Sequence, residues 1–147
     1  MSSLSSFILL GHLLGLAMAV GVGAAKVMLL IKCFYDHSLL PAYIRLAGYM
    51  TKLLIAGFAL VTVTGVAWIA LGYSVTSVLW IKIVLVVAVW LIGPYIDNVV
   101  EPVFSKLAPK AGEQATPEFI KVQKKHLALE VLAEGLFIVI IFLWVLA

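Results

Sequence analysis

The sequence predicts an all-α integral membrane protein, a bundle of four helices that run up, down, up and down. Of the 147 residues, 65% are hydrophobic and only 12% are charged, and the apolar residues are concentrated in four long runs. An average soluble domain is about 45–50% apolar and about 25% charged. Because this small number of charged side chains cannot cover a water-facing surface, most of the surface must face lipid. We interpret residues 1–147 as a single transmembrane domain.

Each of the four apolar runs is long enough for a helix to cross a bilayer, which takes about 20 residues. The runs cover residues 7–25, 53–71, 78–96 and 127–147. They lack the strict alternation of polar and apolar residues that is typical of a membrane β-barrel. Residues 27–35 continue the first helix without a breaker and residues 42–52 lead into the second. We therefore expect the helices to extend beyond the membrane on one side.

Turn and capping residues separate the runs. Asp36, Ser38 and Pro41 follow the first helix and are typical of a helix end and a new helix start. Residues 72–74 end the second helix, and residues 76–77 supply the N-cap of the third. The last connection covers residues 107–116, where Thr116 precedes a proline and a glutamate and so predicts the N-cap of the fourth helix.

The basic residues indicate the orientation in the membrane. Nine of the ten lie in or beside the first and third connections, whereas Lys82 lies inside the third span and residues 1–6 and 72–77 contain no Lys or Arg. The nine are Lys26, Lys32, Arg45, Lys52, Lys106, Lys110, Lys121, Lys124 and Lys125. Positively charged loops stay in the cytoplasm. The sequence thus predicts an inner-membrane protein with both termini in the periplasm. This topology explains the net charge of +3 without nucleic-acid binding.

His12 lies inside the first span, where an ionisable residue is rare and usually faces the bundle interior. Gly15, Ala19 and Gly23 follow it at helical spacing and share its face. Because these residues have little or no side chain, they leave a narrow space, or slot, along the His12 face of the helix. Two interpretations stay open: a closely packed neighbouring helix with a hydrogen-bonded histidine, or a flat cofactor such as haem with His12 as axial ligand.

Lys82 lies four residues into the third span, and His12 lies five residues into the first. The two spans run in the same direction, so the two side chains should lie at similar depth. Lys82 could extend to the lipid headgroups. Alternatively, it could turn inward and pair with a haem propionate, a substrate carboxylate or Glu134.

A third group of ionisable residues marks the inner boundary of the membrane. His126, Glu130 and Glu134 share one face of the last helix. Lys26, Lys52 and Asp97 are expected at about the same depth in the membrane as His126 and Glu130, and Glu101 follows one turn beyond Asp97. One interpretation is a belt of ion pairs that joins the helix ends, with Lys52 or Lys82 as partner of Glu134. The other is a metal site or proton path built from His126, Glu130, Glu134 and Asp97.

Three short motifs resemble those of a known membrane superfamily. They are Leu10-Gly11-His12-Leu13-Leu14 early in the first span, Val61-Thr62-Val63-Thr64-Gly65 in the second, and Trp80-Ile81-Lys82 at the start of the third. With the four-helix pattern they are similar to the CopD/HemJ-like superfamily. It includes CopD-type copper proteins and HemJ-type protoporphyrinogen oxidases.

The resemblance implies a haem b-binding membrane oxidoreductase, with His12 as haem ligand and Lys82 as the partner of a substrate or propionate. It also implies a tetrapyrrole or a quinone as binding partner in the lipid bilayer. Unlike the HemJ-type family, the third span has no histidine near its cytoplasmic end, where residues 94–97 read Pro-Tyr-Ile-Asp. Two other hypotheses stay open: metal or proton handling, with a metal ion at the last helix, and a non-catalytic role as a homo-oligomer or as a subunit of a larger complex.

Overall fold

The computed structural model describes residues 3–110 and 112–145. These residues form helices and connecting turns and include no strand. The long helices are α1 (Ser3–Tyr35), α2 (Leu40–Ala70), α3 (Ser77–Tyr95) and α5 (Pro117–Val145). Three shorter elements complete the chain: η1 (His37–Leu39), the π-helical turn η2 (Ile96–Val100) and α4 (Glu101–Leu107).

Four helical segments are long and apolar enough to cross a membrane. They are Ser3–Tyr35, His37–Ala70, Ser77–Leu107 and Pro117–Leu143. The predicted all-α class and the four membrane-length apolar helices are confirmed for the described residues, and each segment contains most of the run predicted for it. The last two residues of the fourth predicted run, 146 and 147, lie outside the described part of the chain.

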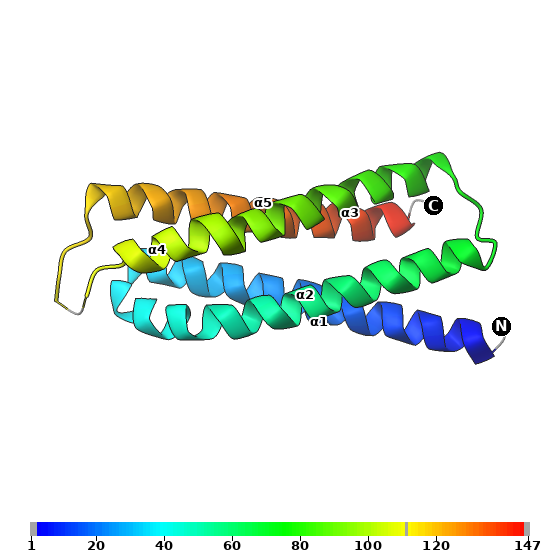
Figure 1. Cartoon of the computed structure of the whole chain (residues 1–147), viewed down its shortest axis with the longest axis horizontal. Coiled ribbons are helices and arrows are strands. Elements are labelled where there is room, and N and C mark those ends of the chain that lie inside the picture. Colours follow the sequence, from blue (N-terminus) through cyan, green and yellow to red (C-terminus); the bar gives the residue numbers. More distant parts are fainter. Residues whose placement is uncertain (1–2, 111, 146–147) are drawn as a thin grey trace.

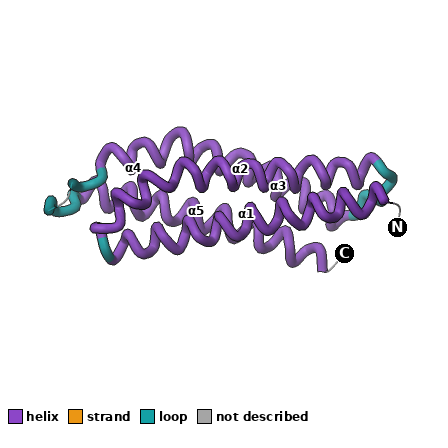
Figure 2. Tube along the Cα trace, turned by 90° about the horizontal axis from the view of Figure 1, so that it is seen from below, coloured by secondary structure: helices purple, strands orange, loops and turns teal. Residues whose placement is uncertain are grey.

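The long helices lie side by side along one axis, and consecutive helices run in opposite directions (Figure 1). The α1–α2 turn and the 108–116 connection lie at one end of the molecule, while both termini lie at the other. Figure 2 shows the same elongated arrangement from below, with loops only at the two ends. Helices α1 and α2 pack along their length and α5 contacts both α1 and α3. The backbones of α2 and α3 stay farther apart, and these two helices meet through side chains such as Phe58 and Trp90, whose ring centroids lie 4.8 Å apart.

The predicted helix caps are confirmed. The Asp36 carboxylate accepts a hydrogen bond from the Ser38 amide at 2.9 Å and so starts η1. The Thr76 hydroxyl accepts from the Leu79 amide at 3.3 Å, and the Thr116 hydroxyl accepts from the Phe119 amide at 3.2 Å. Each cap satisfies an amide in the first turn, which has no partner within its own helix.

Helix α3 continues past Pro94 instead of ending there. A proline has no N–H to donate to the carbonyl one turn earlier. The chain widens into the π-turn Ile96–Val100 just after it, and the Asn98 side-chain amide donates to the Pro94 carbonyl at 2.8 Å. Such turns often lie at functional sites. This one carries Asp97 and leads into α4, which begins at Glu101.

Two separate apolar cores fill the bundle. The core near the loop end contains Leu30, Cys33, Leu40, Tyr43, Ala47, Phe104 and Phe119. The core nearer the termini contains Ala19, Phe58, Val89 and Phe137. In each of the four membrane-length segments, a polar or charged side chain lies between the two cores: Lys26, Thr51, Asp97 and Glu130. The middle of the bundle therefore holds a polar layer with an apolar core on each side.

Candidate functional site

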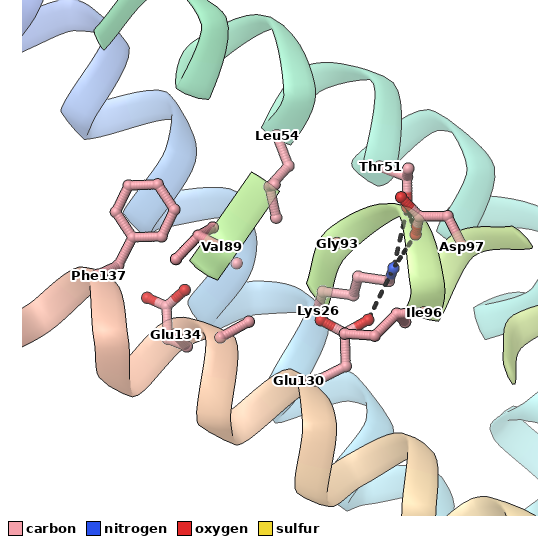
Figure 3. Close-up of a pocket in the computed structure, with 12 residues that line it drawn as sticks. Lys26, Thr51, Leu54, Val89, Gly93, Ile96, Asp97, Glu130, Glu134 and Phe137 are labelled. Atoms are coloured by element: carbon pink, nitrogen blue, oxygen red, sulfur yellow. Dashed lines mark hydrogen bonds and ion pairs between the residues drawn. The ribbon is translucent and has the colours of Figure 1, made fainter. Parts of the chain in front are cut away.

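Lys26 is the centre of the polar layer, and its side chain is only 2% exposed. Its Nζ lies 2.8 Å from Glu130 Oε1, 2.9 Å from Glu101 Oε2 and 2.9 Å from Thr51 Oγ1. These contacts use all three hydrogens of the ammonium group. Asp97 Oδ1 is farther away, at 3.5 Å. Figure 3 shows the Lys26 side chain reaching between Asp97 and Glu130.

The partners of Lys26 come from every other long segment of the chain. Thr51 lies on α2, Asp97 on the π-turn, Glu101 at the start of α4 and Glu130 on α5. Thr51 Oγ1 in turn donates to Asp97 Oδ1 at 3.3 Å. One buried ammonium thus connects all four membrane-length segments, and the ion-pair belt predicted from the sequence is present here.

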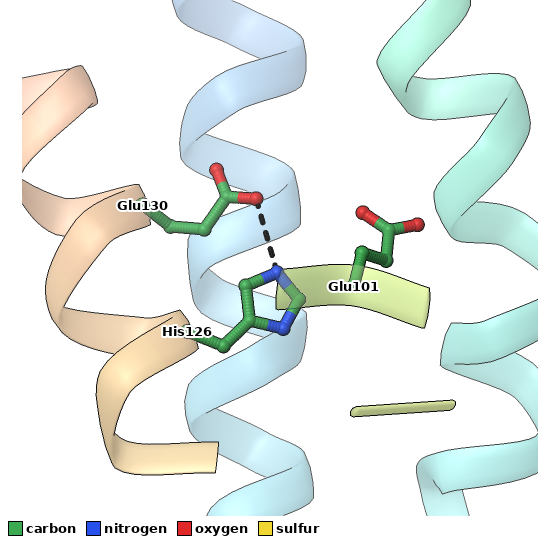
Figure 4. Close-up of side chains that lie close together, drawn as sticks. All are labelled: Glu101, His126 and Glu130. Carbon is green, nitrogen blue, oxygen red and sulfur yellow. Dashed lines mark hydrogen bonds and ion pairs between the residues drawn. The ribbon is translucent and has the colours of Figure 1, made fainter. Parts of the chain in front are cut away.

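His126 extends this cluster toward the loop end and is fully buried. Its Nε2 lies 3.3 Å from Glu130 Oε1 (Figure 4). The same nitrogen lies 3.5 Å from the Tyr43 hydroxyl. An ionised carboxylate can only accept, so this geometry places the imidazole hydrogen on Nε2. Nδ1 is then an acceptor, and it has no hydrogen-bond partner among the described residues. The imidazole therefore has room for one more proton.

Glu134 lies one turn from Glu130 on α5, beside Gly23 of α1. Its Oε1 is buried and has no hydrogen-bond partner among the described residues. Both glutamates line a cavity of about 40 Å³ that also borders Lys26 and Asp97. A water molecule needs about 10–15 Å³ of such space, so the cavity can hold a few waters. Figure 3 shows Glu134 and Glu130 on this cavity wall.

The predicted ion pair of Glu134 with Lys52 or Lys82 is wrong in this structure. Lys52 is exposed, and its Nζ lies over the Tyr49 ring at 5.9 Å. Lys82 forms no ion pair among the described residues. The inward-facing residue of α2 at this level is Thr51, the neighbour of Lys52 in the sequence. The helix therefore directs a hydroxyl, rather than an ammonium, into the cluster.

The charges of the cluster do not balance. Asp97, Glu101 and Glu130 surround Lys26, and Glu134 lines the same cavity. Among the described residues, Lys26 is the only ammonium group at this site. Unpaired ionised carboxylates are costly away from water. Such an excess of carboxyl groups favours holding protons or binding an additional cation.

A metal ion is the less suitable cation. Glu101, His126 and Glu130 each offer a ligand atom, and these atoms lie within 4.8 Å of one another. Glu101 thus takes the place that the sequence prediction gave to Glu134. However, the Lys26 ammonium already binds one oxygen of each glutamate. A metal ion would therefore compete with this ammonium for the two carboxylates.

His12 has a protein partner in α2. Its Nδ1 lies 2.8 Å from Thr64 Oγ1, and Thr64 Oγ1 donates to the Leu60 carbonyl at 2.6 Å. Because the single hydroxyl hydrogen goes to that carbonyl, His12 Nδ1 is the donor to Thr64. His12 and Lys82 share no hydrogen bond among the described residues. A shared site for the two side chains stays a prediction.

The stripe of small residues beside His12 is filled by other parts of the protein. A Cβ added at Gly15 would lie 2.8 Å from the Gly57 carbonyl oxygen, and one added at Gly57 would lie 2.8 Å from the Ala19 nitrogen. At Gly23 an added Cβ would collide with the Glu134 carboxylate. Helices α1 and α2 thus pack backbone to backbone. The slot predicted for a flat cofactor beside Gly15, Ala19 and Gly23 is therefore occupied by the protein itself, while haem ligation by His12 stays a prediction.

Comparisons with protein-family models, with curated proteins and with solved structures found no match for this chain. The site must therefore be judged from its own chemistry: one buried ammonium, a buried imidazole, four carboxyl groups and a small cavity.

Proposed function

We propose that this chain is a four-span integral membrane protein with its basic end in the cytoplasm and both termini outside. Support comes from the four membrane-length apolar helices and from large apolar side chains on the outer surface, such as Phe7 (73% exposed), Leu91 (70%) and Phe142 (66%). A soluble monomer rarely exposes so continuous an apolar surface. The basic residues near the α1–α2 turn and the 108–116 connection favour this orientation.

We propose further that the protein handles protons at the buried cluster around Lys26. The observation that carries this proposal is the excess of carboxyl groups there, four against one ammonium, within membrane-length helices. Intramembrane carboxyl and imidazole groups in contact are typical of proton relays. This hypothesis replaces haem b-dependent oxidation as our preferred function, because α2 fills the slot beside His12.

The route for a proton would follow one face of α5. Water in the cavity would connect Glu134 to Glu130, and Glu130 contacts His126 Nε2 at 3.3 Å. When His126 takes a proton at Nδ1, it can release the Nε2 hydrogen to the Glu130 carboxylate. Lys26 would stabilise whichever carboxylates are ionised. The proton can thus move between an imidazole and a carboxylate without any large side-chain movement.

Both ends of this route are closed by aromatic side chains. Phe104 lies against His126 with 5.0 Å between ring centroids and also packs on Tyr43 and Phe119. On the other side, Phe58 and Phe137 pack with centroids 4.8 Å apart. The cluster is not an open channel. Exchange with water on either side would need movement of one of these aromatic groups.

The test is proton flux in liposomes that contain the purified protein and a trapped pH-sensitive dye. We expect the wild type to dissipate an imposed pH gradient faster than empty liposomes. Glu130→Gln should lower the rate at least about tenfold, since a positioned proton-transfer group contributes about 10²–10⁴-fold. Glu113→Gln is the matched control, because Glu113 is exposed in the 108–116 connection. Equal rates for Glu130→Gln and the wild type would refute the proposal.

A further inference from the structure

A groove between α2 and α3 leads from the outer surface of the bundle to the acidic cluster. Leu54 and Phe58 of α2 and Trp90 and Gly93 of α3 line it, and its volume is about 60 Å³. It adjoins the cavity beside Lys26, because Leu54, Gly93 and Asp97 line both. The groove lies where the backbones of α2 and α3 stay apart, beside the contact of the Trp90 ring with Phe58 at 4.8 Å between centroids. In the proposed membrane orientation, it opens sideways into lipid.

Asp97 is the carboxylate at the inner end of this groove. The three hydrogens of Lys26 go to Glu130, Glu101 and Thr51, so Asp97 has only the longer 3.5 Å ion pair with the ammonium. Its Oδ1 accepts from Thr51, and its Oδ2 has no hydrogen bond among the described residues. The Asp97 side chain is also 22% exposed, more than those of Glu101 and Glu130. Of the three acids that contact Lys26, it is the one most open to a ligand.

The approaches to Asp97 along the bundle axis are closed by apolar packing. The core that contains Tyr43 and Phe104 lies toward the loop end, and the core that contains Phe58 and Phe137 lies toward the termini. A ligand that reaches Asp97 would therefore enter from the side, and the groove offers such a route from the lipid. Such a ligand needs an apolar part for Leu54, Phe58 and Trp90 and a small head with positive charge for the acidic cluster.

We infer that the α2–α3 groove binds a membrane-dissolved amphiphile with a single alkyl chain and a cationic amine head, which pairs with Asp97. The inference deepens the proposed function and rests on it, because the amine would meet the same excess of carboxyl groups that holds protons. The charged groups facing the head are Asp97, Glu101, Glu130 and Glu134, with Lys26 and His126 behind them. Carboxylates outnumber the ammonium, so a second cation is favoured over an anionic or neutral head.

The test is calorimetric titration of the protein in phosphatidylcholine nanodiscs with dodecylammonium, with dodecanol as the uncharged probe of equal chain length and empty nanodiscs as background. We expect saturable binding of dodecylammonium to the wild type, at least about tenfold tighter than dodecanol, which corresponds to about 1.4 kcal/mol. Asp97→Asn should remove this preference for the amine. Equal binding of both probes to the wild type, or unchanged amine preference in Asp97→Asn, would overturn the inference.

A second variant tests the groove itself and does not alter any charge. A Cβ at Gly93 meets no atom within 4 Å, so Gly93→Leu can fold while its side chain fills the groove. Gly48→Leu is the matched control, because its Cβ also meets nothing and Gly48 does not line the groove. Gly93→Leu should abolish dodecylammonium binding, and Gly48→Leu should retain it. Binding that survives Gly93→Leu would contradict the groove as the site.

The two proposals can fail separately. If Glu130→Gln lowers proton flux but no saturable amine binding is found, only the amphiphile inference falls. If dodecylammonium binds through Asp97 while Glu130→Gln leaves the flux unchanged, the proton route falls and the cation site stands alone.

Discussion

The Lys26 ammonium on α1 lies 2.8 Å from the Glu130 carboxylate on α5, in the polar layer between the two apolar cores. Both side chains are almost fully buried, at 2% and 7% exposed. Removing one partner of a buried ion pair leaves the other charge without compensation. This pair therefore couples the stability of the bundle to the protonation of its acidic residues.

We expect Lys26→Met to destabilise the protein by about 3–5 kcal/mol near neutral pH, because the surrounding carboxylates lose their counter-charge. The loss should shrink as the pH falls, since protonated carboxyl groups need no ammonium. Unfolding by denaturing detergent, followed by circular dichroism at several pH values, measures it. Lys52→Met is the matched control, because Lys52 is exposed on α2. A loss for Lys26→Met that is the same at every pH would contradict this explanation.

The contact of α1 with α2 should not tolerate a single added methyl group at Gly57. A Cβ there would lie 2.8 Å from the Met18 Cβ and 2.9 Å from the Gly15 carbonyl oxygen. Gly57→Ala should therefore cost about 1–3 kcal/mol in the same unfolding assay. Gly65→Ala on the same helix meets nothing within 4 Å and should be stabilising by about 0.5–1 kcal/mol. Similar effects of the two substitutions would show that the helices are not in backbone contact.

His12→Ala should remove one hydrogen bond, that with Thr64, and cost about 1 kcal/mol. Because α2 fills the slot beside His12, we expect the visible absorption spectra of the purified wild type and variant to be identical. A Soret band in the wild type that His12→Ala abolishes would instead support the haem site implied by the CopD/HemJ-like resemblance.

The Asp36 cap should make the turn between α1 and η1 sensitive to acid. Hydrogen bonds from Ser38 to its carboxylate lower the Asp36 pKa below its ordinary 3.8. Because the Asp36 pKa is lower in the folded state, the ionised carboxylate stabilises the turn at neutral pH. This stabilisation is lost as the pH falls through the folded-state pKa. Amide hydrogen exchange at residues 37–39 should therefore accelerate in strong acid. In Asp36→Ala exchange should already be fast at neutral pH.

The sequence was sufficient for the spans, the turns and the level of the buried charges. Hydropathy and capping residues predicted the helix ends, and counting residues from each end placed Lys26, Asp97, Glu101, His126 and Glu130 together. Counting residues does not give the rotation of each helix about its axis. This rotation determines that Thr51, rather than Lys52, faces the cluster. It also sets Glu134 against Gly23 instead of against a lysine.

The glycine stripe shows a second limit of the sequence. Gly15, Ala19 and Gly23 are equally suited to a flat cofactor and to a close helix neighbour, because both need the same missing side chains. The partner that decides between them is Gly57, forty-two positions along the chain from Gly15. Only the packing of α1 on α2 brings the two glycines into contact.

The most direct test of the account is infrared difference spectroscopy of the purified protein as the pH is changed through the neutral range. Protonated carboxyl groups have a C=O stretching band of their own, distinct from that of carboxylates. We predict such a band in the wild type that titrates with pH, is lost or shifted in Glu130→Gln and Glu134→Gln, and is unchanged in Glu113→Gln. A wild-type spectrum without this band, or with one that neither cluster variant alters, would contradict proton binding at the Lys26 cluster.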